Sequence, residues 1–200
     1  MSAKSVRPQV NPMLRTIHAF ALAFWLFCLN QAEAQGSFQG DVNTKWISNG
    51  RGMQLTESFA FTDALGRVWE VPKGTIVDGA SIPRVLWTIV GAPFAGKYRK
   101  ASVIHDYFCE TMSRPWQDVH KAFFDAQLAE GNSEYHAKLL YGGVYAWGPR
   151  WEVVNGKPRR TREAIEAPSS DDLDKLAEFI KSKNPDASSI IKYTEGNFRR

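Results

Sequence analysis

The hydrophobic pattern of this chain changes its period once, close to Pro83. Before that residue, positions 42–72 alternate loosely between polar and apolar and carry turn signals, which is typical of short strands. After it, apolar residues recur every three to four positions, as they do on one face of a helix. Because the strands all precede the helices, the two kinds of element should form separate layers. The pattern predicts an α+β fold in which a small N-terminal antiparallel sheet packs on three to four helices.

Four stretches carry the helical pattern. They run from Pro83 to about Val90 and over about residues 98–111, 117–130 and 133–147. The last stretch is nearly all apolar after Lys138, so we expect it at the centre of the core. We expect a single domain over residues 35–154. Residues 155–200 are more polar and predict a charged, largely flexible C-terminal extension with a weak helix near 171–181.

The first 34 residues have the layout of a signal peptide. Basic residues precede an uncharged run from Ile17 to Leu29, and residues 32–34 read Ala-Glu-Ala, which fits the small-x-small cleavage rule. The run is shorter than the ~20 residues that a membrane-spanning helix needs. We expect cleavage after residue 34 and export to the periplasm or the medium. If translation began at Met13 instead of Met1, the basic segment before the apolar run would be shorter and would fit the signal-peptide layout better.

The composition limits the classes of molecule that we expect as partners. Without the leader, 22 basic and 20 acidic side chains nearly balance, so nucleic acid is not expected as the main partner. Cys109 is then the only cysteine, and no intramolecular disulfide can form even in an oxidising compartment. We interpret the basic run at 157–162 as a solvated segment, with a membrane lipid or a cell-envelope polymer as the alternative partner.

The candidate chemistry concentrates around an adjacent pair, His105 and Asp106, inside an apolar helix. Titratable groups are costly among apolar residues unless they are paired, metal-bound or functional. Asp118 and His120 stand on the next helix, and antiparallel packing would bring one of them to His105. Cys109 shares a helix face with His105, and we interpret it as a buried apolar residue rather than a nucleophile.

Two metals fit two subsets of these residues. Asp78 and Asp106, with carbonyls from the turn that follows Asp78, offer the oxygen ligands that calcium prefers. His105, His120 and a carboxylate would suit zinc instead. A histidine held by a carboxylate could also act as a general base without metal. The structural alternative is that the histidines are satisfied core groups and that Asp78 only caps its turn.

Four motifs follow one another in residues 71–151. They read V-P-K-G-T-I-V-D-G-A-S-I-P-R, I-H-D-Y-F-C, S-R-P-W-Q-D-V-H-K-A-F and Y-G-G-V-Y-A-W-G-P-R-W. In this order they resemble a phage- and bacterium-borne group, the domain of unknown function family 1353. The family carries no established activity, so the resemblance implies a shared fold rather than a reaction.

A fainter pattern involves the same region. It consists of Asp78-Gly79-Ala80-Ser81, then Ala101-Ser102-Val103-Ile104-His105-Asp106, then Asp118 or His120 before Phe123. This order is similar to secreted bacterial phospholipases of the A-two type. The resemblance implies that His105 activates water while Asp78 and Asp106 hold calcium, which polarises the ester carbonyl. The cysteines that those enzymes pair are replaced here by Ala80 and Ser102.

The leading functional hypothesis from the sequence is an exported, metal-assisted hydrolase of phospholipid esters. His105 with Asp118 or His120 would be catalytic, and Asp78 and Asp106 would bind the metal. One alternative is a non-catalytic envelope or phage-associated module. Another is a zinc-dependent hydrolase of peptidoglycan or peptides. The metal content of the purified protein would separate the three.

Overall fold

The computed structural model describes residues 36–48, 52–79, 81–91, 97–162 and 168–198. Contacts divide the chain into two units, residues 1–34 and residues 35–200. The predicted signal peptide and its cleavage site lie outside the described residues. The description below concerns the second unit.

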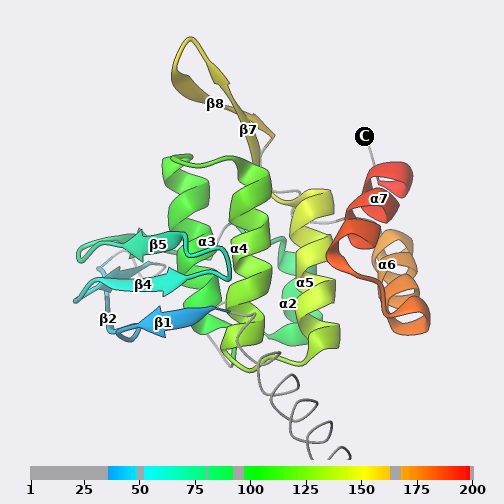
Figure 1. Cartoon of the computed structure of the whole chain (residues 1–200), viewed down its shortest axis with the longest axis horizontal. Helices are drawn as coiled ribbons and strands as arrows, with labels where there is room; N and C mark the ends of the chain where they lie inside the picture. Colours follow the sequence, from blue (N-terminus) through cyan, green and yellow to red (C-terminus); the bar gives the residue numbers. More distant parts are fainter. Residues whose placement is uncertain (1–35, 49–51, 80, 92–96, 163–167, 199–200) are drawn as a thin grey trace, which may run out of the picture. The chain divides into compact units, whose positions relative to one another are not determined.

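Two small antiparallel sheets form the N-terminal part of this unit (Figure 1). The first has the order β1-β4-β5 and the second β2-β3-β6. The strands are β1 (Ser37–Gln39), β2 (Thr44–Trp46), β3 (Met53–Leu55), β4 (Phe59–Thr62), β5 (Val68–Val71) and β6 (Ile76–Val77). Alternate side chains point inward, so Phe59 and Phe61 of β4 and Trp69 and Val71 of β5 are buried.

Four helices follow the sheets, as the change of period predicts. They are α2 (Arg84–Val90), α3 (Arg99–Thr111), α4 (Trp116–Ala129) and α5 (Glu134–Trp147). Pro83 and Pro115 directly precede two of them, where a fixed φ and a missing N–H cost nothing. From residue 137 to 147 every side chain of α5 is buried, which confirms its central place in the core. The α+β fold class is thereby confirmed.

Close packing of α2 on α5 and capping of α3 fix the positions of these helices. A Cβ atom at Gly143 would lie 2.5 Å from a methyl carbon of Leu86, so glycine lets α2 pack directly on α5. The side chain of Tyr98, the N-cap residue of α3, accepts no hydrogen bond from the first turn of the helix. The carboxylate of Glu130, just after α4, accepts hydrogen bonds from the backbone N–H groups of Lys100 at 2.9 Å and Ala101 at 3.2 Å instead. The end of α4 is therefore tied to the beginning of α3.

The C-terminal part differs from the flexible extension that the sequence predicts. It contains a hairpin of β7 (Arg150–Val154) and β8 (Lys157–Arg162), then α6 (Ser170–Lys183) and α7 (Ala187–Asn197). Both helices contact α5, and Leu176 and Ile190 are fully buried. Each helix has only a narrow apolar stripe, and the large central helix α5 supplies the partner surface that makes such a stripe sufficient. None of the helices in the described ranges combines the length and apolar composition that a membrane span requires.

Candidate functional site

The carboxylate of Asp106 on α3 holds the turn that follows β6. Its Oδ2 atom accepts hydrogen bonds from the backbone N–H groups of Asp78 at 2.9 Å and Gly79 at 3.1 Å, and its Oδ1 atom accepts one from Ser81 at 3.3 Å. Gly79 has a φ of 76°, a conformation that favours glycine. Burial raises the pKa of Asp106, and these hydrogen bonds oppose that shift. The Asp106 side chain thus connects the turn to the helix.

His105, the neighbour of Asp106, faces the α3–α4 interface. Its Nδ1 atom lies 3.0 Å from Oγ of Ser81, and its Nε2 atom lies 2.9 Å from Nδ1 of His120 on α4. Both imidazole rings are completely buried. The two antiparallel helices therefore bring together two histidines that are 15 residues apart.

Cys109 completes a cluster with the two histidines. Its sulfur lies one helical turn after His105, at 3.6 Å from Nε2 of that ring, and the side chain is buried. One ligand atom each from His105, Cys109 and His120 can be chosen so that all three lie within 4.8 Å of one another. Among the described residues, this is the one group of histidine, cysteine and acidic side chains close enough to share a metal ion. We call it the His–Cys–His cluster.

Burial keeps the members of the cluster uncharged. It lowers the pKa of His105 to about 3 and holds the pKa of His120 well below its usual value, where the charges of His105 and Arg150 add to the effect. Burial, together with the Asp106 charge, raises the pKa of the Cys109 thiol. At neutral pH the rings are therefore neutral, which is the form in which imidazole binds metals.

The outer nitrogens of the two rings differ in their partners. Nδ1 of His105 is next to the Ser81 hydroxyl, as described above. Nε2 of His120 is buried and forms no hydrogen bond of normal geometry, although the backbone carbonyl of Pro149 is close enough to favour the protonated ring. The hydrogen bond between the two inner nitrogens needs one proton, so that proton must move to an outer nitrogen before both rings can bind a metal.

Aromatic side chains enclose the cluster. The ring centroid of Phe123 is 4.6 Å from that of His105, and the centroid of Trp116 is 5.4 Å from that of His120. Tyr145 of α5 packs against the same face of the cluster, 6.4 Å from His120. The surroundings are therefore apolar, which strengthens any electrostatic interaction made inside them.

The structure places the sequence-predicted residues in three different environments. His105 and His120 contact each other directly. Asp118 instead forms an ion pair with Arg67 at 3.0 Å and lies outside the cluster. Asp78 is exposed and meets Asp106 through its backbone N–H group. Ala80, whose carbonyl was a predicted calcium ligand, lies outside the described residues.

Sequence reasoning assigns no site role to Cys109 or Ser81. The signal for Cys109 is its spacing of four residues from His105, which places both side chains on one helix face. Nothing in the sequence points to Ser81 beyond its place in the turn, because its contact with His105 depends on how the turn packs against α3.

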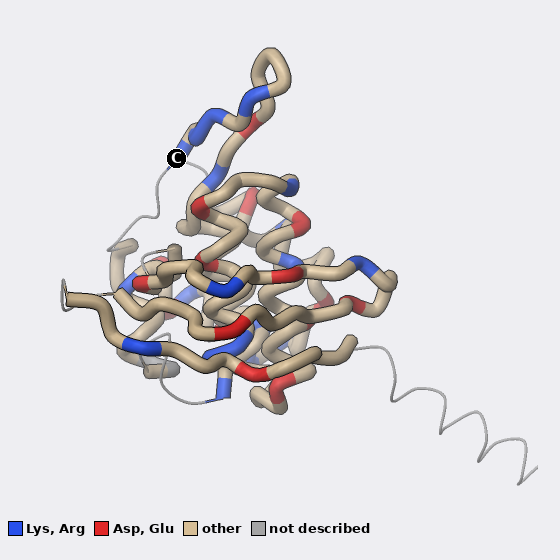
Figure 2. Tube along the Cα trace, turned by 90° about the vertical axis from the view of Figure 1, so that its left-hand side faces the viewer, with Lys and Arg blue, Asp and Glu red and all other residues tan. Residues whose placement is uncertain are grey.

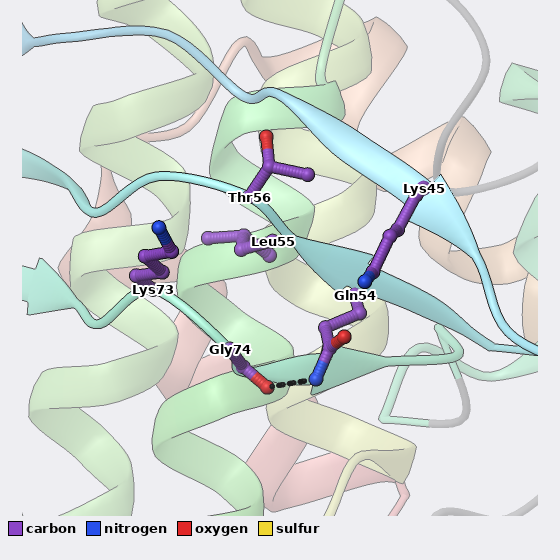
Figure 3. Close-up of a pocket in the computed structure, with 6 residues that line it drawn as sticks. All are labelled: Lys45, Gln54, Leu55, Thr56, Lys73 and Gly74. Atoms are coloured by element: carbon purple, nitrogen blue, oxygen red, sulfur yellow. Dashed lines mark hydrogen bonds between the residues drawn. The ribbon is translucent and has the colours of Figure 1, made fainter.

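A separate surface pocket of about 370 Å³ lies beside β3 (Figure 3). Its lining residues are Lys45, Gln54, Leu55, Thr56, Lys73 and Gly74. The Gln54 amide donates a hydrogen bond to the carbonyl of Gly74 at 3.1 Å and so connects the two sides. The pocket has no histidine, cysteine or carboxylate, and the candidate chemistry of the described residues therefore lies in the His–Cys–His cluster.

The sequence of the cluster region matches a known family model. The model is described as "Protein of unknown function (DUF1353)" and matches residues 53–144. The matched segment includes every member of the cluster, and the resemblance predicted from the sequence motifs is confirmed over this range.

Two relatives come from Sinorhizobium fredii (strain NBRC 101917 / NGR234). "Uncharacterized protein y4jT" is 51% identical over 106 residues, which cover 51% of this chain and 32% of that protein. "Uncharacterized protein y4iH" is 44% identical over 97 residues, which cover 48% of this chain and 41% of that protein. The chain thus spans less than half the length of either relative. No solved structure matches it. Neither the family nor these relatives are described as phospholipases, so that resemblance is not confirmed.

Proposed function

We propose that residues 53–144 form a zinc-binding domain whose ligands are Nε2 of His105, Sγ of Cys109 and Nδ1 of His120. The observation that carries the proposal is that one ligand atom from each of these three side chains lies within 4.8 Å of the others. Two imidazoles and one thiolate form a donor set that suits zinc.

The spacing of the donor atoms supports a tetrahedral site. With Zn–N near 2.05 Å and Zn–S near 2.3 Å, tetrahedral angles put nitrogen and sulfur about 3.5 Å apart and two nitrogens about 3.3 Å apart. The observed separations are 3.6 Å from Cys109 Sγ to His105 Nε2 and 2.9 Å between the two histidine nitrogens. A small separation of the rings would admit the ion, and the distance from the sulfur to Nε2 of His105 already fits.

The oxygen behind His105 supports the same ligand assignment. Metal-binding histidines nearly always donate their other ring N–H to an oxygen, which fixes the tautomer and the ring orientation. The Ser81 hydroxyl has this place behind His105, whereas Nε2 of His120 forms no hydrogen bond of normal geometry. Zinc binding would also require Cys109 to lose its proton, and the metal's own charge favours the thiolate.

The donor set favours zinc over calcium. Calcium binds oxygen ligands, and the cluster offers nitrogen and sulfur. Both carboxylate oxygens of Asp106, a predicted calcium ligand, already accept backbone hydrogen bonds from the 78–81 turn. We therefore propose that Asp106 supports the site by holding Ser81 next to His105.

If zinc were bound with water as a further ligand, it would supply the chemistry for hydrolysis of an ester or amide, and His105, Cys109 and His120 would hold it. A second candidate role is non-catalytic, in which the ion would only stabilise the α3–α4 interface. The complete burial of both histidines favours this candidate, because structural metal sites are closed.

The test is metal analysis of the purified protein by mass spectrometry, with hydrolysis of ester and peptide substrates measured before and after chelation. We expect one zinc per wild-type chain, and less than a tenth of that in Cys109→Ser and His120→Gln. Asp118→Asn is the matched control and should keep the metal, since Asp118 lies outside the cluster. Absence of stoichiometric metal from the wild type would overturn the proposal. Stoichiometric zinc without hydrolysis would select the non-catalytic candidate.

A further inference from the structure

The β7–β8 hairpin extends beyond the ends of α3 and α5 (Figure 1). Eight consecutive residues, 152–159, are exposed. They include two apolar side chains next to the turn, Val153 at 69% exposure and Val154 at 38%. Exposed apolar residues at the end of a projecting element mark a surface that contacts another molecule.

The base of the hairpin, in contrast, is firmly attached. Trp151 is buried and donates its indole N–H to the carbonyl of Arg114 at 2.8 Å. Arg160 donates to the carbonyl of Cys109 at 2.8 Å, and Arg162 donates to the carbonyl of Gly148 at 3.0 Å. These carbonyls lie at or near the C-terminal ends of helices, where positive charge is favourable. The body of the protein therefore holds the hairpin while its tip projects.

The tip carries one exposed valine on each face, and the face of Val154 also carries Lys157. Val153 and Val154 are consecutive in β7, so their side chains point to opposite faces of the ribbon. Val153 is paired with Pro158 across the strands, which extends the apolar surface on one face. A groove on a partner protein would cover one face of such a ribbon, whereas a lipid surface surrounds the tip on both faces.

Basic side chains accompany this apolar tip. Residues 150–162 contain five basic side chains and one acidic side chain, whereas the chain from residue 35 onward is nearly balanced (Figure 2). Arg150, Arg160 and Arg162 donate to backbone carbonyls of the body, so Lys157 and Arg159 are the basic side chains of the tip. Lys157, beside the turn, is paired with Val154, and Arg159 forms an ion pair with Glu152. Each lysine or arginine near an anionic membrane surface adds about 1 kcal/mol of attraction.

We propose that the β7–β8 hairpin docks this protein on an anionic lipid bilayer, with Val153 and Val154 at the level of the headgroups and Lys157 and Arg159 against the lipid phosphates. The open edges of a two-stranded ribbon carry unpaired backbone groups, which cannot enter the hydrocarbon core. Insertion is therefore confined to the outer ~5–10 Å of the bilayer, as for other interfacial elements.

Co-sedimentation of the full chain with vesicles tests this proposal. We expect binding to vesicles of phosphatidylcholine and phosphatidylserine that weakens as salt rises, and little binding to phosphatidylcholine alone. The double variant Lys157→Gln/Arg159→Gln should bind about thirtyfold more weakly. The matched control is Lys181→Gln/Lys183→Gln on α6, which removes the same charge from two other exposed positions and should bind like the wild type.

The apolar part of the proposal has its own variant. Val153→Ser/Val154→Ser keeps every charge and should also weaken binding, and because both positions are exposed the melting temperature should stay unchanged. Equal binding by the wild type and both hairpin variants would overturn the proposal. So would equal weakening by the α6 control, which indicates a general charge effect, or tighter binding to DNA or to a protein partner than to anionic vesicles.

Discussion

Two buried polar clusters of this protein are satisfied in different ways. Near β5, the Asp63 carboxylate accepts hydrogen bonds from the Arg67 guanidinium at 2.7 Å, from the Trp69 indole at 3.0 Å and from the backbone N–H of Leu65 at 3.0 Å. At the α3–α4 interface, the His–Cys–His cluster brings together three uncharged groups. The Asp63 cluster surrounds a charged carboxylate, whereas the His–Cys–His cluster contains only uncharged groups.

The pKa values reflect this difference. Burial alone would raise the pKa of Asp63, but the hydrogen bonds from Trp69 and Arg67 outweigh burial and the pKa is lowered. Burial prevails in the other cluster and lowers the pKa of His105 to about 3. The Asp63 carboxylate is fully paired within the chain, whereas the His–Cys–His cluster leaves Nε2 of His120 without a hydrogen bond of normal geometry. Buried polar groups alone therefore do not indicate a functional site; what matters is whether the chain itself already satisfies them.

The largest expected effect is stabilisation by zinc. At a thousandfold excess over the dissociation constant, a ligand that binds only the folded state adds about 4 kcal/mol, or about 10 °C in melting temperature for a domain of this size. Scanning calorimetry should show this shift in the wild type and in Asp63→Asn, which leaves the His–Cys–His cluster intact. Cys109→Ser should show none. A similar shift in Cys109→Ser would mean that zinc binds elsewhere.

The next effect concerns stability without metal. Asp63→Asn keeps the shape of the side chain but removes the charge that Arg67 and the Trp69 indole N–H face, so we expect a loss of about 2–3 kcal/mol. Cys109→Ser should cost about 1 kcal/mol in the same urea titration, since no strong hydrogen bond is broken. If Cys109→Ser were the more harmful change in metal-free protein, the comparison between the clusters would be wrong.

The two clusters should also respond to different pH ranges. The unfolded chain protonates His105 near pH 6.5, whereas the folded chain resists protonation until about pH 3, so stability falls as the pH decreases through this range. Metal-free protein should lose about 1 kcal/mol between about pH 6.5 and 5.5 from this ring.

Asp63, with its lowered pKa, keeps its contribution until the pH falls below its unfolded value of 3.8. Urea titrations of wild type and His105→Gln at several pH values measure the difference, and the variant should show the shallower slope above pH 3.8. Identical slopes would show that His105 does not titrate on unfolding.

The smallest effect is expected at Asp118. Its ion pair with Arg67 is partly exposed, with 43% of the Asp118 side chain accessible, so Asp118→Asn should cost less than about 1 kcal/mol. Zinc content and the pH dependence of stability should not change. A loss of zinc in this variant would bring Asp118 back into the site and would favour the carboxylate partner over His120.

Much of the fold could be predicted from the sequence because it depends on local patterns. The change of period near Pro83 marks the boundary between sheets and helices, and the apolar run after Lys138 marks the central helix. The helices after residue 168 were underestimated because their stripes are narrow, and only contact with α5 shows what they pack against. Pairing of strands into two separate sheets depends on long-range contacts, which no local pattern contains.

The site was predictable only in part, for a geometric reason. Asp118 and His120 are two residues apart on α4, so they point in very different directions. Which of them meets His105 depends on how α4 is rotated about its own axis, and that rotation is set by packing against α3 and α5. The role of Cys109 could have been recognised from its spacing to His105, but a buried cysteine on an apolar helix face looks the same whether or not it binds a metal.

The hydrogen bonds from the 78–81 turn to Asp106 join residues 25 to 28 positions apart. They act as a noncovalent loop closure, so the geometry around His105 does not depend on the length of the chain in between. Lengthening a closed loop is inexpensive, at about 0.6 kcal/mol for each doubling. Added residues in this loop should therefore cost little wherever they lie outside α2, whereas α2 itself must stay because its Leu86 is fully buried against Gly143 of α5.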